Sequence, residues 1–235
     1  EQSLKGALAG ESGIRRCDEK LYGEYGAKIA CRVGGTVQGF DPSMHVEAKF
    51  ASRYDSIINF ALAAASEAIA DSKLELSETT NDRVGCIIGT AVTGSETWHR
   101  VMHQAFVQTE AEKISSASVI AVSGNMPTGV LALRYHLRGP TFGVVNACAS
   151  GTTAICLAAE RIRAGKADAM LAGGTEAAIG LFMYAAFLNA GAMNPTADPV
   201  RASKPFSKDR CGFVKGEGCG LMVLEELGAA RARGA

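Results

Sequence analysis

One segment of this sequence, residues 142–151, constrains the fold more than any other. An apolar run with β-branched residues at 142–145 is followed by Cys148 and then by small residues that lead into a helical pattern. A strand that turns directly into a helix places its turn residue at the helix N-terminus, where backbone N–H groups and the helix dipole stabilise a thiolate. The same N–H groups can stabilise an oxyanion. We therefore expect Cys148 to be a nucleophile suited to acyl transfer.

The context of Cys148 matters, because a free cysteine is more often a small buried core residue. Gly139 and Pro140 precede the strand, Gly151 falls in the first helical turn, and a second strand ends at Gly173–Gly174. This pattern favours a reactive cysteine at a tight turn.

Hydrophobic periodicity predicts strands that alternate with helices, which implies an α/β layered fold. The expected strands are near 29–37 and at 84–90, 142–147, 169–172 and 221–224. The expected helices are a short one within 1–50, then 49–72, one from Ser95 that includes His99 and His103, 119–137 with an irregularity at Pro127, 150–164 and 225–234. The apolar run 177–188 is shorter than the roughly 20 residues that a membrane span needs, and it predicts a buried helix beside a hydrophobic pocket.

The bulk properties narrow the class of protein. The 235 residues carry no formal net charge, so nothing attracts the chain as a whole to nucleic acid or to an anionic membrane. Seven cysteines without paired spacing, and a start without an apolar signal core, indicate a reducing, cytoplasmic location.

Four motifs, in order, closely resemble β-ketoacyl-acyl-carrier-protein synthases, and among them the type II elongating condensing enzymes and polyketide ketosynthases. They are Leu-Arg-Gly-Pro at 137–140, Asn-Ala-Cys-Ala-Ser-Gly at 146–151, Ala-Gly-Gly-Thr-Glu at 172–176, and the run from Pro205 to Gly218. The resemblance implies a thiolase-like α-β-α-β-α fold of two similar halves. Residues 1–235 look like the N-terminal, nucleophile-bearing half, with the C-terminal half absent.

The resemblance also implies a reaction. Cys148 would accept an acyl group from acyl carrier protein, and the acyl group would then condense with malonyl carrier protein as carbon dioxide leaves. The product would be a 3-oxoacyl carrier protein of fatty-acid or polyketide biosynthesis. The backbone N–H of Cys148 would contribute to the oxyanion hole, while a second donor and two histidines belong to the family's C-terminal half, so we expect 1–235 alone to be inactive.

No bound cofactor is expected, since the substrates are carried on the phosphopantetheine of acyl carrier protein. By resemblance, Val92 and Phe182 would line the acyl pocket, and Lys49 and Arg53 would contact the carrier protein, although Ser52 stands at a third position that is basic in the family. The resemblance implies a homodimer, or a heterodimer of ketosynthase and chain-length factor.

Two departures from the family pattern concern the active-site surroundings. Ser207 and Cys211 replace acidic residues of a mobile entrance loop, so gating can differ and Cys211 is a second thiol there. Ala91 and Thr93, on either side of Val92, replace common glycines, so the family's chain-length preference does not transfer.

No metal or nucleotide site is expected. His99 and His103 lie four residues apart, but Arg100 stands where the zinc protease motif has Glu, and two histidines are fewer than the usual three or four ligands. The glycine-rich run 216–220 precedes a strand rather than the helix that phosphate binding needs.

Two alternatives stay open. A thiolase would act on coenzyme A thioesters and would carry a second active cysteine in its C-terminal half. A non-catalytic partner like the chain-length factors would lack the nucleophile. Cys148 argues against that partner, whereas Ser207 and Cys211 keep it possible.

Overall fold

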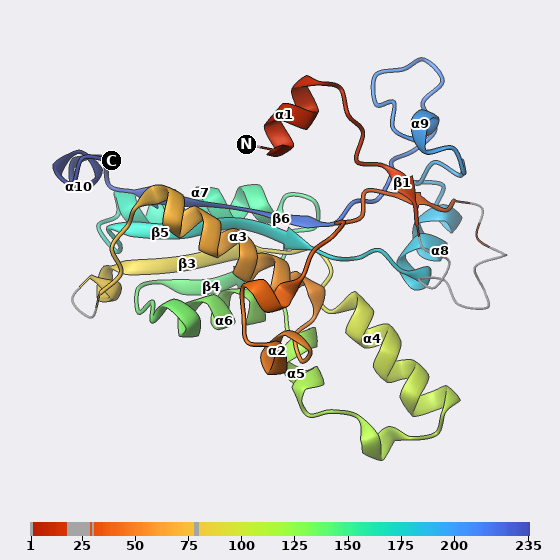
Figure 1. Ribbon diagram of the computed structural model, residues 1–235, viewed down its shortest axis with the longest axis horizontal. Coiled ribbons are helices and arrows are strands. Elements are labelled where there is room, and N and C mark those ends of the chain that lie inside the picture. The colour runs from red at the N-terminus through yellow and green to blue at the C-terminus, as the bar shows by residue number, and fades with distance from the viewer. Residues whose placement is uncertain (1, 18–28, 30, 78–79) are drawn as a thin grey trace. The chain divides into compact units, whose positions relative to one another are not determined.

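The computed structural model describes residues 2–17, 29, 31–77 and 80–235, which divide into two compact units (Figure 1). The smaller unit contains Glu1–Gly39 and Ala178–Glu217, and the larger contains Phe40–Ala177 and Gly218–Ala235.

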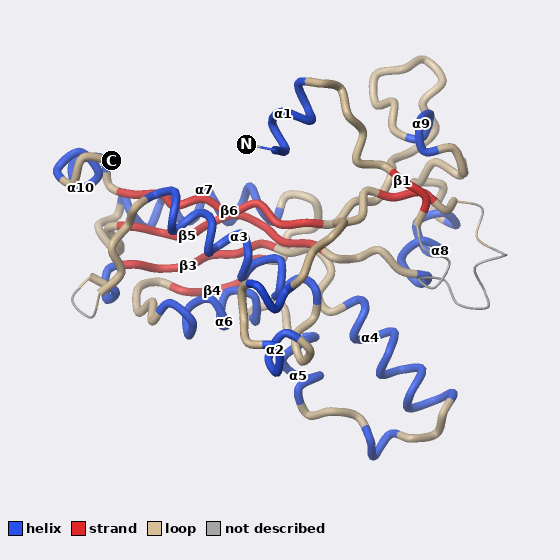
Figure 2. Tube along the Cα trace, in the orientation of Figure 1, coloured by secondary structure: helices blue, strands red, loops and turns tan. Residues whose placement is uncertain are grey.

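The larger unit is built on a four-stranded sheet (Figure 2). Its strands are β3 (Val84–Gly89), β4 (Thr141–Val144), β5 (Ala169–Glu176) and β6 (Gly218–Glu225), in the order β4-β3-β5-β6. The strands β4, β3 and β5 run parallel, and β6 is antiparallel to β5. This mixed sheet with helices between its strands confirms the α/β class.

Helices cover both faces of this sheet. Because side chains alternate along a strand, neighbouring residues of β3 face opposite sides. Cys86 and Ile88 pack toward α3 (Ser56–Ser72) and α6 (Met126–Tyr135), whereas Ile87 packs toward α7 (Ser150–Arg163). The result is a helix–sheet–helix sandwich.

The expected helix 49–72 is in fact two helices, α2 (Ala48–Ala51) and α3. Asp55 causes the break, because its carboxylate accepts a hydrogen bond from the Ile57 N–H (3.3 Å) and so caps α3. Its other oxygen accepts from the N–H and the hydroxyl of Thr97, at 3.1 and 2.8 Å. This buried carboxylate therefore joins α3 to the start of α4 (Ser95–Met102).

Two further helices also differ from expectation. The segment 119–137 forms α5 (Ala117–Val122) and α6, with residues 123–125 between them. Pro127 lies in the first turn of α6, where its missing N–H costs nothing, so it is not an irregularity. The helix from Ser95 is confirmed, but His103 begins a π-helical turn, His103–Val107.

Both β5 and β6 are longer than expected. β5 continues through the glycines at 173–174 to Glu176, and β6 begins at Gly218 rather than at Leu221. The glycines allow this because a side chain at Gly173 would collide with the carbonyl of Gly220 on the neighbouring strand. Three of the five residues in the 216–220 run, those at 218–220, are therefore strand. The helix that follows, α10 (Leu227–Ala232), begins near its expected place.

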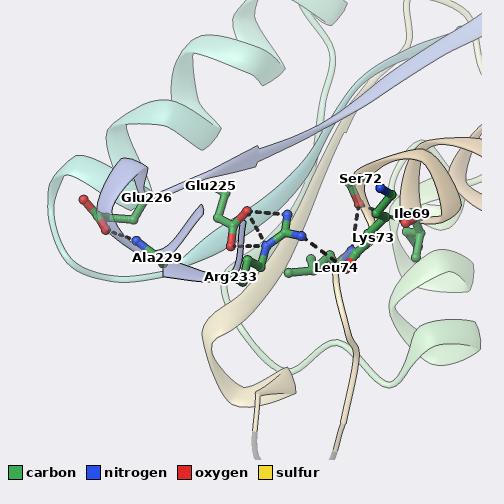
Figure 3. A network of polar contacts seen from close by, with 8 residues as sticks. All are labelled: Ile69, Ser72, Lys73, Leu74, Glu225, Glu226, Ala229 and Arg233. Atoms are coloured by element: carbon green, nitrogen blue, oxygen red, sulfur yellow. Dashed lines mark hydrogen bonds and ion pairs between the residues drawn. The ribbon is translucent and has the colours of Figure 1, made fainter. Parts of the chain in front are cut away.

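Within the larger unit, Arg233 connects the segment after α10 to the end of β6 and the end of α3 (Figure 3). Its guanidinium donates to both carboxylate oxygens of Glu225, at 2.7 to 3.0 Å, and to the carbonyl of Lys73 at 3.2 Å. Lys73 adopts a left-handed conformation that ends α3. The carboxylate of Glu225 raises the pKa of Arg233.

The smaller unit has its own core, in which Tyr184 is fully buried and donates a hydrogen bond to the Val33 carbonyl at 3.0 Å. Its described elements are α1 (Gln2–Leu8), β1 (Arg15–Arg16), β2 (Val33–Gly34), α8 (Leu181–Asn189) and α9 (Pro199–Ala202), with β1 antiparallel to β2. The strand expected near 29–37 is reduced to β2, and residue 30 lies outside the described residues. The apolar run 177–188 becomes helical only from Leu181.

Short 3-10 helices lie at Pro42–Met44, Asn81–Arg83 and Ala111–Lys113. In the part of the chain that the structure describes, no helix has the length and apolarity to cross a membrane.

Candidate active site

The sequence-predicted nucleophile and one pocket residue lie at the same edge of the sheet. Because β4, β3 and β5 are parallel, their carboxyl ends share one edge. Val92 follows β3, Cys148 follows β4, and Glu176 ends β5. Ligands bind preferentially at such an edge in parallel α/β sheets.

Cys148 lies in a tight connection between β4 and α7, the elbow of residues 145–149. Its neighbour Ala147 has φ +46°, a left-handed conformation that costs an L-residue about 1 kcal/mol. Ser150 holds this turn, since its hydroxyl donates to the Ala147 carbonyl at 2.7 Å and accepts from the Asn146 N–H at 2.8 Å. The predicted strand-to-helix turn is thus observed, and the strain is of the kind found at nucleophile turns.

Three glycines allow the N-terminus of α7 to pack directly against the sheet. A Cβ at Gly89, the last residue of β3, would collide with the backbone of Ser150. A Cβ at Gly174 of β5 would approach the Gly151 Cα to 3.1 Å. This close approach of backbones fixes the height of Cys148 above the sheet.

The seven thiols differ in accessibility. Cys148 is exposed, as are Cys156 and Cys211. Burial raises the pKa of Cys86 and of Cys219 to about 12, so both thiols stay protonated at neutral pH. A nucleophilic role would require exposure, which Cys148 has at the elbow.

The loop that carries Val92, residues 90–94, is called here the β3 loop. The Thr90 N–H donates to the Val144 carbonyl at 3.0 Å, and the Thr93 hydroxyl donates to the Val122 carbonyl at 3.1 Å. Between these ends, Glu176 accepts hydrogen bonds from the N–H groups of Ala91 and Val92. The family motif at 172–176 includes Glu176, but sequence reasoning gave it no role.

The predicted docking residues lie on the exposed α2 segment. Lys49 forms an ion pair with Glu47 at 2.9 Å and lies 4.8 Å from the centre of the Phe50 ring. Arg53 follows the helix and is exposed. A pocket of about 210 Å³ lies beside Lys49 rather than at Cys148. It is lined by Val46, Glu47, Phe50, Tyr54, Leu62, Val130, Leu133 and Arg134.

The entrance-loop residues and Phe182 belong to the smaller unit. The Ser207 hydroxyl donates to Asp209, whose other oxygen lies 2.5 Å from the Lys204 ammonium group. The hydrogen bonds from Lys204 and then from Ser207 lower the pKa of Asp209 to about 2. An acid thus remains in this loop at a position that sequence reasoning did not single out. Phe182 is 70% exposed on α8, which does not fit the expected buried helix, and its role in the acyl pocket stays a prediction.

His99 and His103 are both exposed. Across residues 2–17, 29, 31–77 and 80–235, no three His, Cys, Asp or Glu side chains gather in a way that could hold a metal ion.

Comparison with known proteins places this geometry in a family. Residues 1–230 match the model of the β-ketoacyl synthase N-terminal domain. A 3-oxoacyl-[acyl-carrier-protein] synthase 2 of Synechocystis is 40% identical over 207 residues, which are 88% of this chain and 50% of the relative. The chain spans about half the length of the curated relatives it matches.

Solved structures agree. A β-ketoacyl synthase from Burkholderia phymatum superposes with a TM-score of 0.86 at 28% identity, over 100% of this chain and 57% of that one. A ketosynthase bound to a hexaketide and in complex with its type II polyketide acyl-carrier protein gives 0.82 at 27% identity, over 96% and 54%. The fold is therefore the thiolase-like fold of ketosynthases. Because the chain carries the four motifs and the elbow, and because the family model spans nearly all of its length, this chain belongs to the β-ketoacyl synthase family.

Proposed function

We propose that this chain is the nucleophile-bearing half of a decarboxylating condensing enzyme that forms 3-oxoacyl carrier protein. The observation that carries the proposal is the exposed Cys148 in a strained elbow at the N-terminus of α7. A second half of the enzyme would supply the remaining oxyanion donor and the histidines.

The chemistry follows from the elbow. The Cys148 sulfur attacks the acyl carbonyl, a new C–S bond forms, and the carrier thiol leaves with a proton. Malonyl carrier protein then loses carbon dioxide, and the resulting enolate carbon forms a C–C bond to the acyl carbonyl. The Cys148 thiol leaves and regains its proton. Because α7 begins at Ser150, its N-terminal dipole would stabilise oxyanion charge that develops at the Cys148 thioester in both steps.

The partner we propose is acyl carrier protein, with Lys49 and Arg53 as contacts. The ketosynthase solved with its carrier protein supports this choice. The pocket beside Lys49 offers a surface of mixed apolar and polar side chains next to these charges.

The test of this function is a condensation assay on the complete enzyme. Acyl and malonyl carrier proteins should yield one 3-oxoacyl carrier protein per carbon dioxide released, measured by mass spectrometry. Formation of 3-oxoacyl coenzyme A without decarboxylation would instead identify a thiolase. An enzyme that is never acylated at Cys148 would identify a chain-length-factor-like subunit.

Val92 offers a steric test of the acyl pocket. In Val92→Phe, the rate with long acyl primers should fall about tenfold relative to short ones, because a packed pocket cannot absorb the added ring. The ratio of kcat/KM values for long and short primers measures this. Val119→Phe is the matched control, since Val119 is 70% exposed on α5. Equal long-to-short ratios in Val92→Phe and the wild type would refute the placement.

The docking charges offer an electrostatic test. Reversing both Lys49 and Arg53 to Glu should raise the KM for acyl carrier protein about tenfold at low salt and leave kcat unchanged, because exposed charges mainly steer encounter. The difference from wild type should shrink as salt increases. Lys166→Glu changes an exposed charge in the turn before β5 and is the control. A wild-type KM in the double variant would remove this surface from the proposal.

We also expect a dimer. Among the described strands, β4 is at the edge of its sheet and pairs with β3 on one side. An edge strand is a ready template for pairing with a second chain, and the family resemblance implies an antiparallel pairing there. Light scattering of the complete enzyme should give twice the monomer mass, and an active monomer at assay concentration would contradict this.

A further inference from the structure

We propose that Glu176 is a positioning residue that sets acyl-chain selectivity by holding the β3 loop in place. The inference rests on the proposed function, because it concerns the loop that carries Val92. It adds a residue on a different strand, β5, to the determinants of the pocket.

Glu176 contacts the β3 loop through two hydrogen bonds to the backbone. One carboxylate oxygen of Glu176 accepts hydrogen bonds from the N–H of Ala91 at 2.9 Å and from the N–H of Val92 at 3.2 Å. Hydrogen bonds to an ionised acceptor are roughly twice as strong as those between neutral groups. These two hydrogen bonds therefore fix the main chain of Val92 rather than its side chain.

The direction of Glu176 is set by the alternation of β5. Met170 and Ala172 pack on the α7 face, and Glu176 follows them by even steps. Thr175 points to the opposite face, where its hydroxyl donates to the Ile57 carbonyl at 2.8 Å. The alternation of β5 therefore places Glu176 on the face opposite Thr175.

The two ends of the β3 loop are anchored independently of Glu176. Thr90 is held by the Val144 carbonyl at one end. At the other end, Gly94 has φ +60°, and a Cβ there would approach the backbone of Ala121 and Val122 to 2.7 Å. Loss of the carboxylate should therefore loosen the middle of the loop, Ala91 and Val92, and leave its ends in place.

The elbow has its own hydrogen bonds, from Asn146 and Ser150, so the reactivity of Cys148 toward a small reagent should not depend on Glu176. This separation distinguishes a residue that positions the pocket from one that supports the whole site.

The experiment compares Glu176→Ala and Glu176→Gln in the complete enzyme, with Glu160→Gln on the exposed surface of α7 as a control of equal charge change. Three quantities are measured: hydrogen exchange at the amides of Ala91 and Val92, the long-to-short ratio of kcat/KM, and the alkylation rate of Cys148 by iodoacetamide. Glu176→Ala should speed hydrogen exchange at both amides about tenfold. It should also change the long-to-short ratio of kcat/KM about tenfold, and each tenfold change corresponds to about 1.4 kcal/mol. Glu176→Gln should lie between, since its amide oxygen still accepts.

Alkylation of Cys148 should match the wild type in all three variants. Wild-type exchange at Ala91 and Val92 in Glu176→Ala would overturn the proposal, as would faster exchange with an unchanged ratio. If Glu176→Ala does not fold, Glu176→Gln decides by the same criteria. A wild-type enzyme that condenses nothing would refute the proposed function, whereas the exchange measurement would still test the grip of Glu176 on the loop.

Discussion

Cys148→Ser in the complete enzyme should lower the rate of condensation by at least about a thousandfold, because a serine hydroxyl is a far weaker nucleophile than a cysteine thiol. The acyl-enzyme should also disappear. Intact-mass analysis after incubation with acyl carrier protein should show one acyl adduct on the wild type and none on the variant.

Cys156→Ser and Cys211→Ser are the matched controls, since both thiols are exposed like Cys148. Each control variant should keep its adduct and most of its activity. Peptide mapping should place the adduct on Cys148, while the thiols of Cys86 and Cys219, with pKa values of about 12, stay unmodified. An adduct mainly on Cys211 or Cys86 would contradict the assignment.

Gly89→Ala should destabilise the enzyme by about 3 kcal/mol, because the new methyl group would collide with backbone atoms of Ser150. The strain should lift the N-terminus of α7 from the sheet and displace Cys148. Denaturant unfolding measures the stability, and the rate of Cys148 acylation measures the displacement. We expect both to fall together.

Gly151→Ala adds the same methyl group in the first turn of α7 and should be tolerated. Its nearest neighbour would be the Gly174 Cα at 3.5 Å, an ordinary contact, and alanine favours a helix over glycine by about 1 kcal/mol. If Gly89→Ala is as stable and as reactive as Gly151→Ala, the packing of α7 on β3 does not control the elbow.

Local patterns predicted the parts of the fold that depend on local forces. The apolar run at 84–90 is β3, and the amphipathic segment 150–164 is α7 to within a residue. The strand expected at 142–147 is β4, which ends earlier, at Val144. Helix boundaries were less predictable where a side chain acts at a distance. Asp55 splits the segment 49–72 because its carboxylate caps α3 and also binds Thr97, 42 residues along the chain, which periodicity cannot show.

The sequence by itself determined the α/β class, the turn at Cys148 and the family, because these depend on the order of residues and on short motifs. Tertiary structure decided which groups surround that turn. It placed Glu176 against Ala91 and Val92, which lie 85 and 84 positions away, and it packed α7 on Gly89 and Gly174. The reason is physical: strand pairing in the order β4-β3-β5 brings three distant chain segments to one edge, and no local propensity encodes that pairing.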